Sequence, residues 1–427
     1  MNINEIFTEY DGILCKSMNT DPLGFQIIWT YFGQKIFESK VTSVALDIRS
    51  YNINLFNHLI IYKLIREDYF NSEVSQTILK LVKTRTGIEK LLVMLENMLT
   101  WSWFLSLHNG DRWSEEQKRG LLGTSKALSL WSDNEELLLN CNQKISNLEV
   151  LKNQKSLGIS GRYKGPFIKM GFFDSYYSTN SYKNAEELFL EVEQVFLGED
   201  STKKLYKQII SYFQEYDYTQ KISDDLVDSF NATFKDKKIL NQLTKEFWID
   251  HLGLKNFEAK ALYEKIELEN KNQSIKSIFK AVYSKESEKF DNILQLEPKL
   301  SYLQLLFDYL LLQDERDVDT LEKRYIEILK DFKWVKAEKN SSAQSRITEL
   351  QKVQDYRSLL EYHKQIMESR GQFPWVKIVD KKIHVNISKN QTLDKIKDAL
   401  EKEIDHIEWI HDYYIFSIRS IKDGFEK

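Results

Sequence analysis

Basic residues and glycines are concentrated between Leu151 and Phe173. This stretch contains no acidic residue, although the formal net charge of the chain is -4, and it holds four of the fifteen glycines. Cationic side chains beside accessible backbone amides are suited to bind phosphate groups. We therefore predict a phosphate or nucleic-acid site in this segment. The residues assigned to it are Lys155, Ser160, Arg162, Tyr163, Lys164 and Lys169.

The turn chemistry of this segment predicts how these side chains are positioned. The sequence LGIS at residues 157–160 resembles the turn of bacterial winged-helix modules, a resemblance that implies DNA as the partner. Pro166 conflicts with a recognition helix that begins at Ser160, because proline removes a hydrogen bond and clashes with the preceding turn. We therefore expect an exposed loop over residues 160–165 and a short helix over residues 166–170. This helix would end at Gly171 and hold an anion at its start.

Two other interpretations of the basic segment stay open. It is either a loop that contacts a protein partner or a glycine-rich corner between helices. Residues 174–182, which follow it, carry three tyrosines among serines. We expect them to form a short strand or wing.

Asp250, Glu258 and Lys260 have the residue types of a magnesium-dependent nuclease. In such a site the carboxylates hold the metal and the lysine stabilises developing charge. The arrangement normally needs the glutamate and the lysine on one face of a strand, whereas residues 257–268 have the composition of a helix. A metal-dependent nuclease, or another enzyme whose site is assembled from distant residues, is therefore the alternative hypothesis.

Other catalytic and cofactor motifs are absent from the sequence. It contains no phosphate-binding GxxxxGK[ST] loop, no GxGxxG fingerprint and no HExxH zinc motif. His406 and His411 would diverge on a helix, and we assign them to a solvated face. We therefore predict no catalytic residue, no metal ligand and no cofactor.

The composition predicts a mainly α, folded chain. Fifteen glycines and four prolines among 427 residues favour helices over a turn-rich β architecture. The two cysteines, Cys15 and Cys141, cannot form a disulfide framework or a four-thiolate metal site. No signal peptide and no long apolar span is evident, so we expect a cytoplasmic protein without membrane contact. The pI near 6.1 restricts any nucleic-acid contact to a local surface.

In the N-terminal part, capping signals and apolar stripes predict successive helices. Asp21 and Pro22 mark the start of an aromatic-rich helix, and a second helix is expected from about Thr42. Residues 91–107 are densely apolar and predict a helix that is buried on several sides. We interpret five polar residues as caps, surface pairs and one hydrogen-bonded histidine rather than as a polar site. They are Asp47, Arg49, Asn52, Asn57 and His58.

The C-terminal part changes character at Gly371. Alternating apolar and polar residues predict a β-hairpin formed by residues 375–379 and 383–387. A hairpin alone is marginally stable, so the body of the protein or a partner should cover one face. One long helix is expected over residues 392–414, and Pro298 is expected to mark a boundary in the preceding helical region.

The expected organisation has four parts. These are an N-terminal helical domain (1–150), a helix-turn-helix or winged-helix-like segment (151–220), a helical domain (221–370), and the β-hairpin with a C-terminal helix (371–427). We predict a non-catalytic DNA-binding or scaffolding subunit of a multi-protein bacterial assembly, with antiviral (anti-phage) defence as the expected setting. The expected partners are nucleic acid, DNA ahead of RNA, and other protein subunits.

Overall fold

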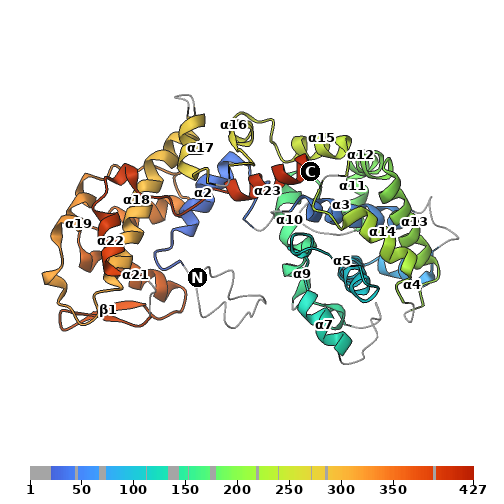
Figure 1. Ribbon diagram of the computed structural model, residues 1–427, viewed down its shortest axis with the longest axis horizontal. Helices are drawn as coiled ribbons and strands as arrows, with labels where there is room; N and C mark the ends of the chain where they lie inside the picture. The colour runs from blue at the N-terminus through green and yellow to red at the C-terminus, as the bar shows by residue number, and fades with distance from the viewer. Residues whose placement is uncertain are drawn as a thin grey trace. The chain divides into compact units, whose positions relative to one another are not determined.

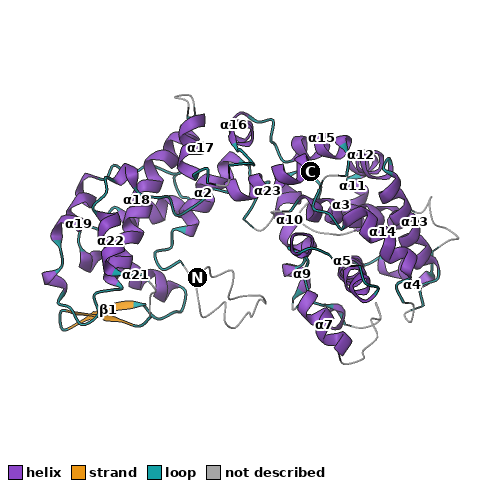
Figure 2. Cartoon of the chain, viewed as in Figure 1, coloured by secondary structure: helices purple, strands orange, loops and turns teal. Residues whose placement is uncertain are grey.

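The computed structural model describes residues 21–427, except 44–46, 67–73, 112, 133–143, 152, 174–178, 218–220, 239, 271, 284–286 and 388–390. The described residues are mainly helical and contain a two-stranded antiparallel sheet near the C-terminus, followed by helix (Figure 2). The predicted mainly α fold with a C-terminal hairpin is therefore confirmed. None of the helices in the described ranges is long and apolar enough to cross a membrane.

The chain forms two compact units, and each combines segments that are distant in sequence. The first unit comprises residues 1–36 and 264–415, and the second comprises residues 37–263 and 416–427. Two helices, α16 (Phe257–Lys265) and α23 (Ile415–Glu426), have residues in both units. The four-part organisation expected from the sequence is a different division, and it stays a prediction.

The first unit is built around α18 (Glu288–Leu310), which packs against α2, α17 and α22. The other elements of this unit are α2 (Gln26–Ile36), α17 (Ile275–Val282), η3 (Val318–Thr320), α19 (Lys323–Glu327), η4 (Ile328–Asp331), α20 (Ser342–Leu350), α21 (Tyr356–Ser369), β1 (Val376–Val379), β2 (Lys382–Val385), α22 (Leu393–Leu400) and η5 (Ile404–His406) (Figure 1). The Asp21 carboxylate accepts a hydrogen bond from the Phe25 amide at 2.8 Å. Asp21 therefore hydrogen-bonds to the chain at the start of α2 as predicted, but Pro22 is not in the first helical turn: the helix begins at Gln26, after Gly24 with a φ of 67°.

Pro298 lies inside α18, so the boundary predicted there is wrong. Proline removes one helical hydrogen bond. The side chains of Leu296, Leu300 and Leu303 around it are each 0% exposed. Full burial of a leucine contributes roughly 1.5–3 kcal/mol, so the packing of this helix outweighs the lost hydrogen bond.

The hairpin is anchored on the first unit by both its face and its edge. β1 and β2 pair antiparallel, with Val376 opposite Val385. Val376 and Ile383 are buried, and β1 packs against α21. At the free edge of β2, the Glu315 amide donates to the Ile383 carbonyl (2.8 Å), and the Ile383 amide donates to the Arg316 carbonyl (2.9 Å). The prediction that another surface covers one face of the hairpin is confirmed, because the body of the first unit does so.

The single long helix predicted over residues 392–414 is wrong. The chain is helical in α22 and again in α23, and between them only η5 is a short helical turn. The buried Glu297 carboxylate accepts hydrogen bonds from the amides of Ile410 and His411 (3.0 and 3.1 Å), which therefore do not donate along a helix. Tyr413 has a φ of 47°, which lies outside the right-handed helical region.

The second unit is built around α5 (Arg85–His108), which packs against α3, α4, α7, α8 and α14. The other elements of this unit are α3 (Ile48–Ile65), α4 (Gln76–Leu81), α6 (Glu115–Lys118), α7 (Thr124–Ser132), α8 (Ile145–Leu148), α9 (Gln154–Leu157), α10 (Ile159–Lys169), α11 (Thr179–Asn184), α12 (Glu186–Leu197), α13 (Asp200–Gln214), α14 (Asp224–Phe234) and α15 (Gln242–His251) (Figure 1). The helix predicted over residues 91–107 is therefore confirmed, as is its burial.

All eighteen residues of α3 are buried, including its polar side chains. Asp47 caps this helix and accepts from the Arg49 amide at 3.0 Å, and His58 Nδ1 lies 2.6 Å from the Tyr182 hydroxyl, as predicted for a cap and a hydrogen-bonded histidine. Arg49 is not on the surface, however. Its guanidinium donates to four backbone carbonyls, which are those of Gln117, Arg119, Phe234 and Lys235. Asn52 is also buried and accepts from the Trp248 indole (2.6 Å). The predicted surface pairs are therefore replaced by interior hydrogen bonds.

Candidate functional site

The basic segment folds into two helices that meet at Gly158. The short helix α9 ends at Leu157, and α10 runs continuously from Ile159 to Lys169, with Pro166 in its interior. The predicted loop over residues 160–165 is therefore wrong, and so is the predicted helix start at Pro166. Gly171 has a φ of 84° and follows the end of α10, as predicted.

The start of α10 is occupied by a carboxylate from α5. Glu96 Oε1 accepts from the Ser160 amide (2.6 Å) and from the Ser160 hydroxyl (2.5 Å), and Glu96 Oε2 accepts from the Gln154 side-chain amide (3.0 Å). Burial raises the pKa of Glu96, and the hydrogen bonds from Ser160 and Gln154 counteract that rise. A carboxylate satisfies the free amides of a first helical turn as a phosphate would. The anion predicted at a helix start in this segment is therefore supplied by the protein itself, at Ser160 rather than at Pro166.

Ser160 and Tyr163 lie on the buried side of α10. Ser160 is 7% exposed and Tyr163 is 3% exposed. The Tyr163 ring meets the Tyr51 ring edge to face at a centroid distance of 4.5 Å, and burial raises the pKa of Tyr163. Neither side chain is presented to a large ligand. Both instead fix α10 to the rest of the second unit, together with the fully buried Phe167.

The remaining predicted residues lie toward solvent. Lys155 forms an ion pair with Glu89 of α5 at 2.8 Å. On α10, Lys169 is exposed, and Arg162 and Lys164 are half-buried. Arg162 and Lys169 are seven residues apart and therefore share one side of the helix. Neither of these two forms an ion pair with any residue in the described ranges.

At Gly165 the outer surface of α10 carries no side chain. A Cβ atom added at this position would meet no other atom within 4 Å. Gly165 lies between Arg162 and Lys169 along the helix and is itself exposed. An extended polyanion can therefore approach the backbone here without displacing a side chain. We call Arg162, Gly165 and Lys169 the basic face of α10, and Lys164 points to another side of the helix.

The winged-helix resemblance does not extend beyond α10. Residues 174–178 of the expected wing lie outside the described residues, and Thr179–Asn184 forms helix α11 rather than a strand. Gly158 has a ψ of 179°, so it separates two helices within one residue and not through a turn of several residues.

The residues proposed for a nuclease site do not converge as a metal site. Asp250 lies near the end of α15 and pairs with Lys255. Glu258 and Lys260 lie on α16, which is helical as the sequence predicted. Residues two positions apart on a helix point to different sides, so Glu258 and Lys260 do not share the face that such a site needs.

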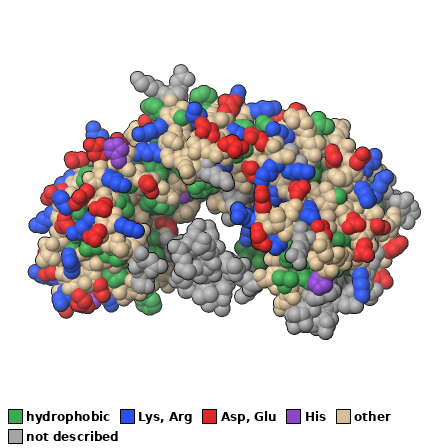
Figure 3. All heavy atoms as spheres, viewed as in Figure 1, with side chains coloured by type: hydrophobic (Ala, Val, Ile, Leu, Met, Phe, Trp, Pro, Cys, Tyr) green, Lys and Arg blue, Asp and Glu red, His purple; other side chains and the backbone are tan. Residues whose placement is uncertain are grey.

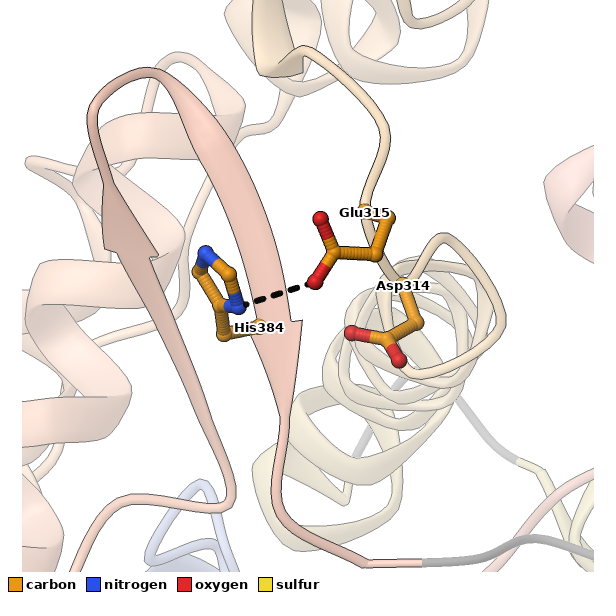
Figure 4. Close-up of side chains that lie close together, drawn as sticks. All are labelled: Asp314, Glu315 and His384. Carbon is orange, nitrogen blue, oxygen red and sulfur yellow. Dashed lines mark ion pairs between the residues drawn. The ribbon is translucent and has the colours of Figure 1, made fainter.

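A group of possible metal ligands is formed in the first unit by residues that the sequence did not indicate. Asp314 and Glu315 follow α18, and His384 lies on β2 (Figure 4). One ligand atom from each lies within 4.8 Å of the others. The two acids and the histidine are distant in sequence, and only the pairing of β2 with the chain after α18 brings them together. No sequence motif of fixed spacing indicates such a group.

Elsewhere on the face drawn in Figure 3, positive and negative side chains do not gather in separate areas. Lys and Arg side chains are interspersed with Asp and Glu across the face shown in Figure 3. This distribution agrees with the pI near 6.1 and with a nucleic-acid contact confined to a small area. No protein-family model, curated protein or solved structure matches the chain in the three comparisons made.

Proposed function

We propose that the protein is a non-catalytic subunit that binds nucleic acid through the basic face of α10. The observation that carries this proposal is the pair of cations Arg162 and Lys169 on one side of α10, with Gly165 between them; neither cation forms an ion pair with a described residue. The opposite side of the helix is fixed by Tyr163 and Phe167, so these charges are presented from a rigid element. Phosphate contacts of this kind position a nucleic acid without reading its sequence.

The mode of binding differs from that predicted from the sequence. Glu96 already satisfies the start of α10, so the phosphates are bound by side chains along the helix rather than by helix-start amides. Two cations neutralise phosphates over only a small area. The proposed setting is therefore a multi-protein bacterial assembly in the cytoplasm, such as an antiviral defence complex, in which other subunits extend the contact. Duplex DNA is the proposed partner ahead of RNA on the sequence resemblance of residues 157–160 alone, because α9 and α10 are separated by Gly158 and not by a winged-helix turn.

Binding of labelled nucleic acids to the full-length protein tests this function. Fluorescence anisotropy would compare duplex DNA, single-stranded DNA and RNA of matched sequence for the wild type, Arg162→Ala and Lys169→Ala. Each substitution is expected to weaken binding, with little dependence on base sequence. Lys204→Ala removes an exposed lysine of α13 in the same unit and is the matched control, expected to bind as the wild type does.

The same binding experiment can exclude the basic face of α10, the nucleic-acid function or the order of partners. Equal binding by Arg162→Ala, Lys169→Ala and Lys204→Ala would exclude the basic face as the nucleic-acid site. The absence of measurable binding to all three nucleic acids would exclude the proposed function. Tighter binding of RNA than of duplex DNA would overturn the order of partners.

A further inference from the structure

We propose that Asp314, Glu315 and His384 form a binding site for a divalent transition-metal ion of the zinc class. The three side chains converge between β2 and the turn after α18 (Figure 4). His384 Nδ1 lies 3.4 Å from Glu315 Oε1. Bonds of about 2.0–2.2 Å from zinc to nitrogen or oxygen place two ligands of one ion roughly 3–4 Å apart. The imidazole and the Glu315 carboxylate already have this separation.

Backbone hydrogen bonds fix the positions from which the three ligands project. The Glu315 amide donates to the Ile383 carbonyl (2.8 Å), directly beside His384. The Val385 amide, on the other side of His384, donates to Asp314 Oδ1 (3.1 Å). The segment that carries the acids and the strand that carries the histidine are therefore joined on both sides of the imidazole. An ion would find the ligands assembled and would have to order only their exposed ends.

The ligand types select the class of ion. Calcium and magnesium prefer sites made of oxygen atoms alone, whereas an imidazole nitrogen with carboxylates suits zinc and its neighbours in the first transition row. Asp314 and Glu315 together carry two negative charges, which would neutralise a divalent ion. Three protein ligands leave at least one coordination position for water. Asp314 and Glu315 are exposed and His384 is half-buried, so an ion can enter from solvent.

A lysine competes with the metal for one ligand. Lys382 Nζ lies 3.8 Å from Glu315 Oε2. This contact gives the metal-free site a partial counter-charge, and an incoming divalent ion must displace it. Removal of Lys382 is therefore expected to tighten metal binding, whereas removal of any of the three ligands weakens it.

The site is tested by titrating Zn²⁺ into the full-length protein after treatment with a chelator and dialysis. Calorimetry would compare the wild type with Asp314→Asn, Glu315→Gln, His384→Asn and Lys382→Ala. Loss of a single ligand is expected to weaken binding by about tenfold or more, since removal of groups that merely orient ligands already costs about 10–100-fold. Lys382→Ala is expected to bind more tightly than the wild type. Circular dichroism would verify that each variant is folded, as expected for substitutions at partly exposed positions.

His406 provides the matched control. It is exposed, and its Nδ1 lies 3.5 Å from Glu403 Oε2, but it belongs to no comparable three-ligand group among the described residues. His406→Asn is expected to bind Zn²⁺ as the wild type does. Zinc binding that survives His384→Asn, or equal affinity for Mg²⁺ and Zn²⁺, would overturn the proposal. It would be overturned equally if the wild type took up no Zn²⁺.

Discussion

Single buried acids determine where helices of this protein begin and end. Glu96 in the second unit and Glu297 in the first are both buried, and each accepts hydrogen bonds from backbone amides of a segment distant in sequence. Glu96 thereby permits α10 to start at Ile159. Glu297 holds the chain before α23 in an irregular conformation. These two side chains account for two of the errors in the helices predicted from the sequence.

Both carboxylate oxygens of Glu297 accept several hydrogen bonds. Its Oε2 accepts from the Trp29 indole (2.7 Å) and the Tyr413 hydroxyl (2.8 Å), and its Oε1 accepts from the Ser301 hydroxyl and from two backbone amides. The partners of the carboxylate are therefore donors at both oxygens. An amide group at this position would place its own N–H groups either against the Trp29 indole or against two backbone amides, none of which can accept a hydrogen bond.

We therefore expect Glu297→Gln to destabilise the first unit. An unsatisfied buried donor costs about 1–3 kcal/mol, and this substitution creates at least one wherever the new amide points. Urea unfolding followed by tryptophan fluorescence would measure the loss. Glu368→Gln makes the same chemical change at an exposed position on α21, and its unfolding free energy should stay within about 0.5 kcal/mol of the wild type. Equal stability of the two variants would contradict the account of Glu297.

At the scale of elements, sequence patterns correctly predicted the features that depend on residues close together in the sequence. The Asp21 carboxylate, the apolar run of α5 and the hairpin each depend on neighbours within a few residues. All of these were predicted correctly. The length of α10 depends instead on an acid 64 residues away, and the end of the predicted C-terminal helix depends on one 113 residues away.

The residues of the candidate site can likewise be divided into features that the nearby sequence indicates and features that depend on distant residues. Its cationic residues were evident in the sequence, because lysine and arginine without nearby acids form a local pattern. The burial of Ser160 and Tyr163 was not, because it depends on α5 and α3. Proline at position 166 also gave a misleading signal. Its cost to a helix is real, but tertiary packing of Phe167 and Tyr163 offsets it.

The hydroxyl of Ser160 tests how firmly α10 is held. Ser160→Ala removes one of the hydrogen bonds to Glu96 and is expected to lower the unfolding free energy of the second unit by about 0.5–1.5 kcal/mol. Ser156→Ala, on the exposed side of α9, is the control and should change it by less than about 0.5 kcal/mol. Chemical denaturation of both variants would give the comparison. An equal effect at Ser156 would show that Glu96 does not stabilise the start of α10 through this serine.

At the scale of the whole molecule, two buried histidines (His58 and His363) and two half-buried ones (His251 and His411) predict how stability depends on pH. Their pKa values are lowered by burial from the ordinary 6.5, to about 3 for His58 and to about 4 for His251, His363 and His411. The folded state therefore favours neutral imidazole, and the unfolded state binds more protons below pH 6.5. The contribution of these neutral histidines to stability is fully present above pH 6.5 and is lost as the pH falls towards 4.

Two buried acids, Glu96 and Glu297, act in the opposite direction, because burial raises the pKa of each. Burial raises the pKa of Glu297 to about 7, so its contribution to stability declines as the pH rises from about 4.5 towards 7. These are two acids against four histidines. The thermal unfolding midpoint, measured by circular dichroism, is therefore expected to fall between about pH 7 and pH 4.5. A midpoint that stayed constant or rose over this range would show that the histidines are not buried in neutral form.

If α10 binds the phosphates of a nucleic acid, the affinity must depend on salt concentration through Arg162 and Lys169. Each phosphate contact changes the slope of log Kobs against log [salt] by about one unit. The Arg162→Ala/Lys169→Ala double variant is therefore expected to bind duplex DNA with a slope about two units shallower than the wild type. Lys204→Ala should keep the wild-type slope. A double variant whose slope equals that of the wild type would show that Arg162 and Lys169 do not contact phosphates.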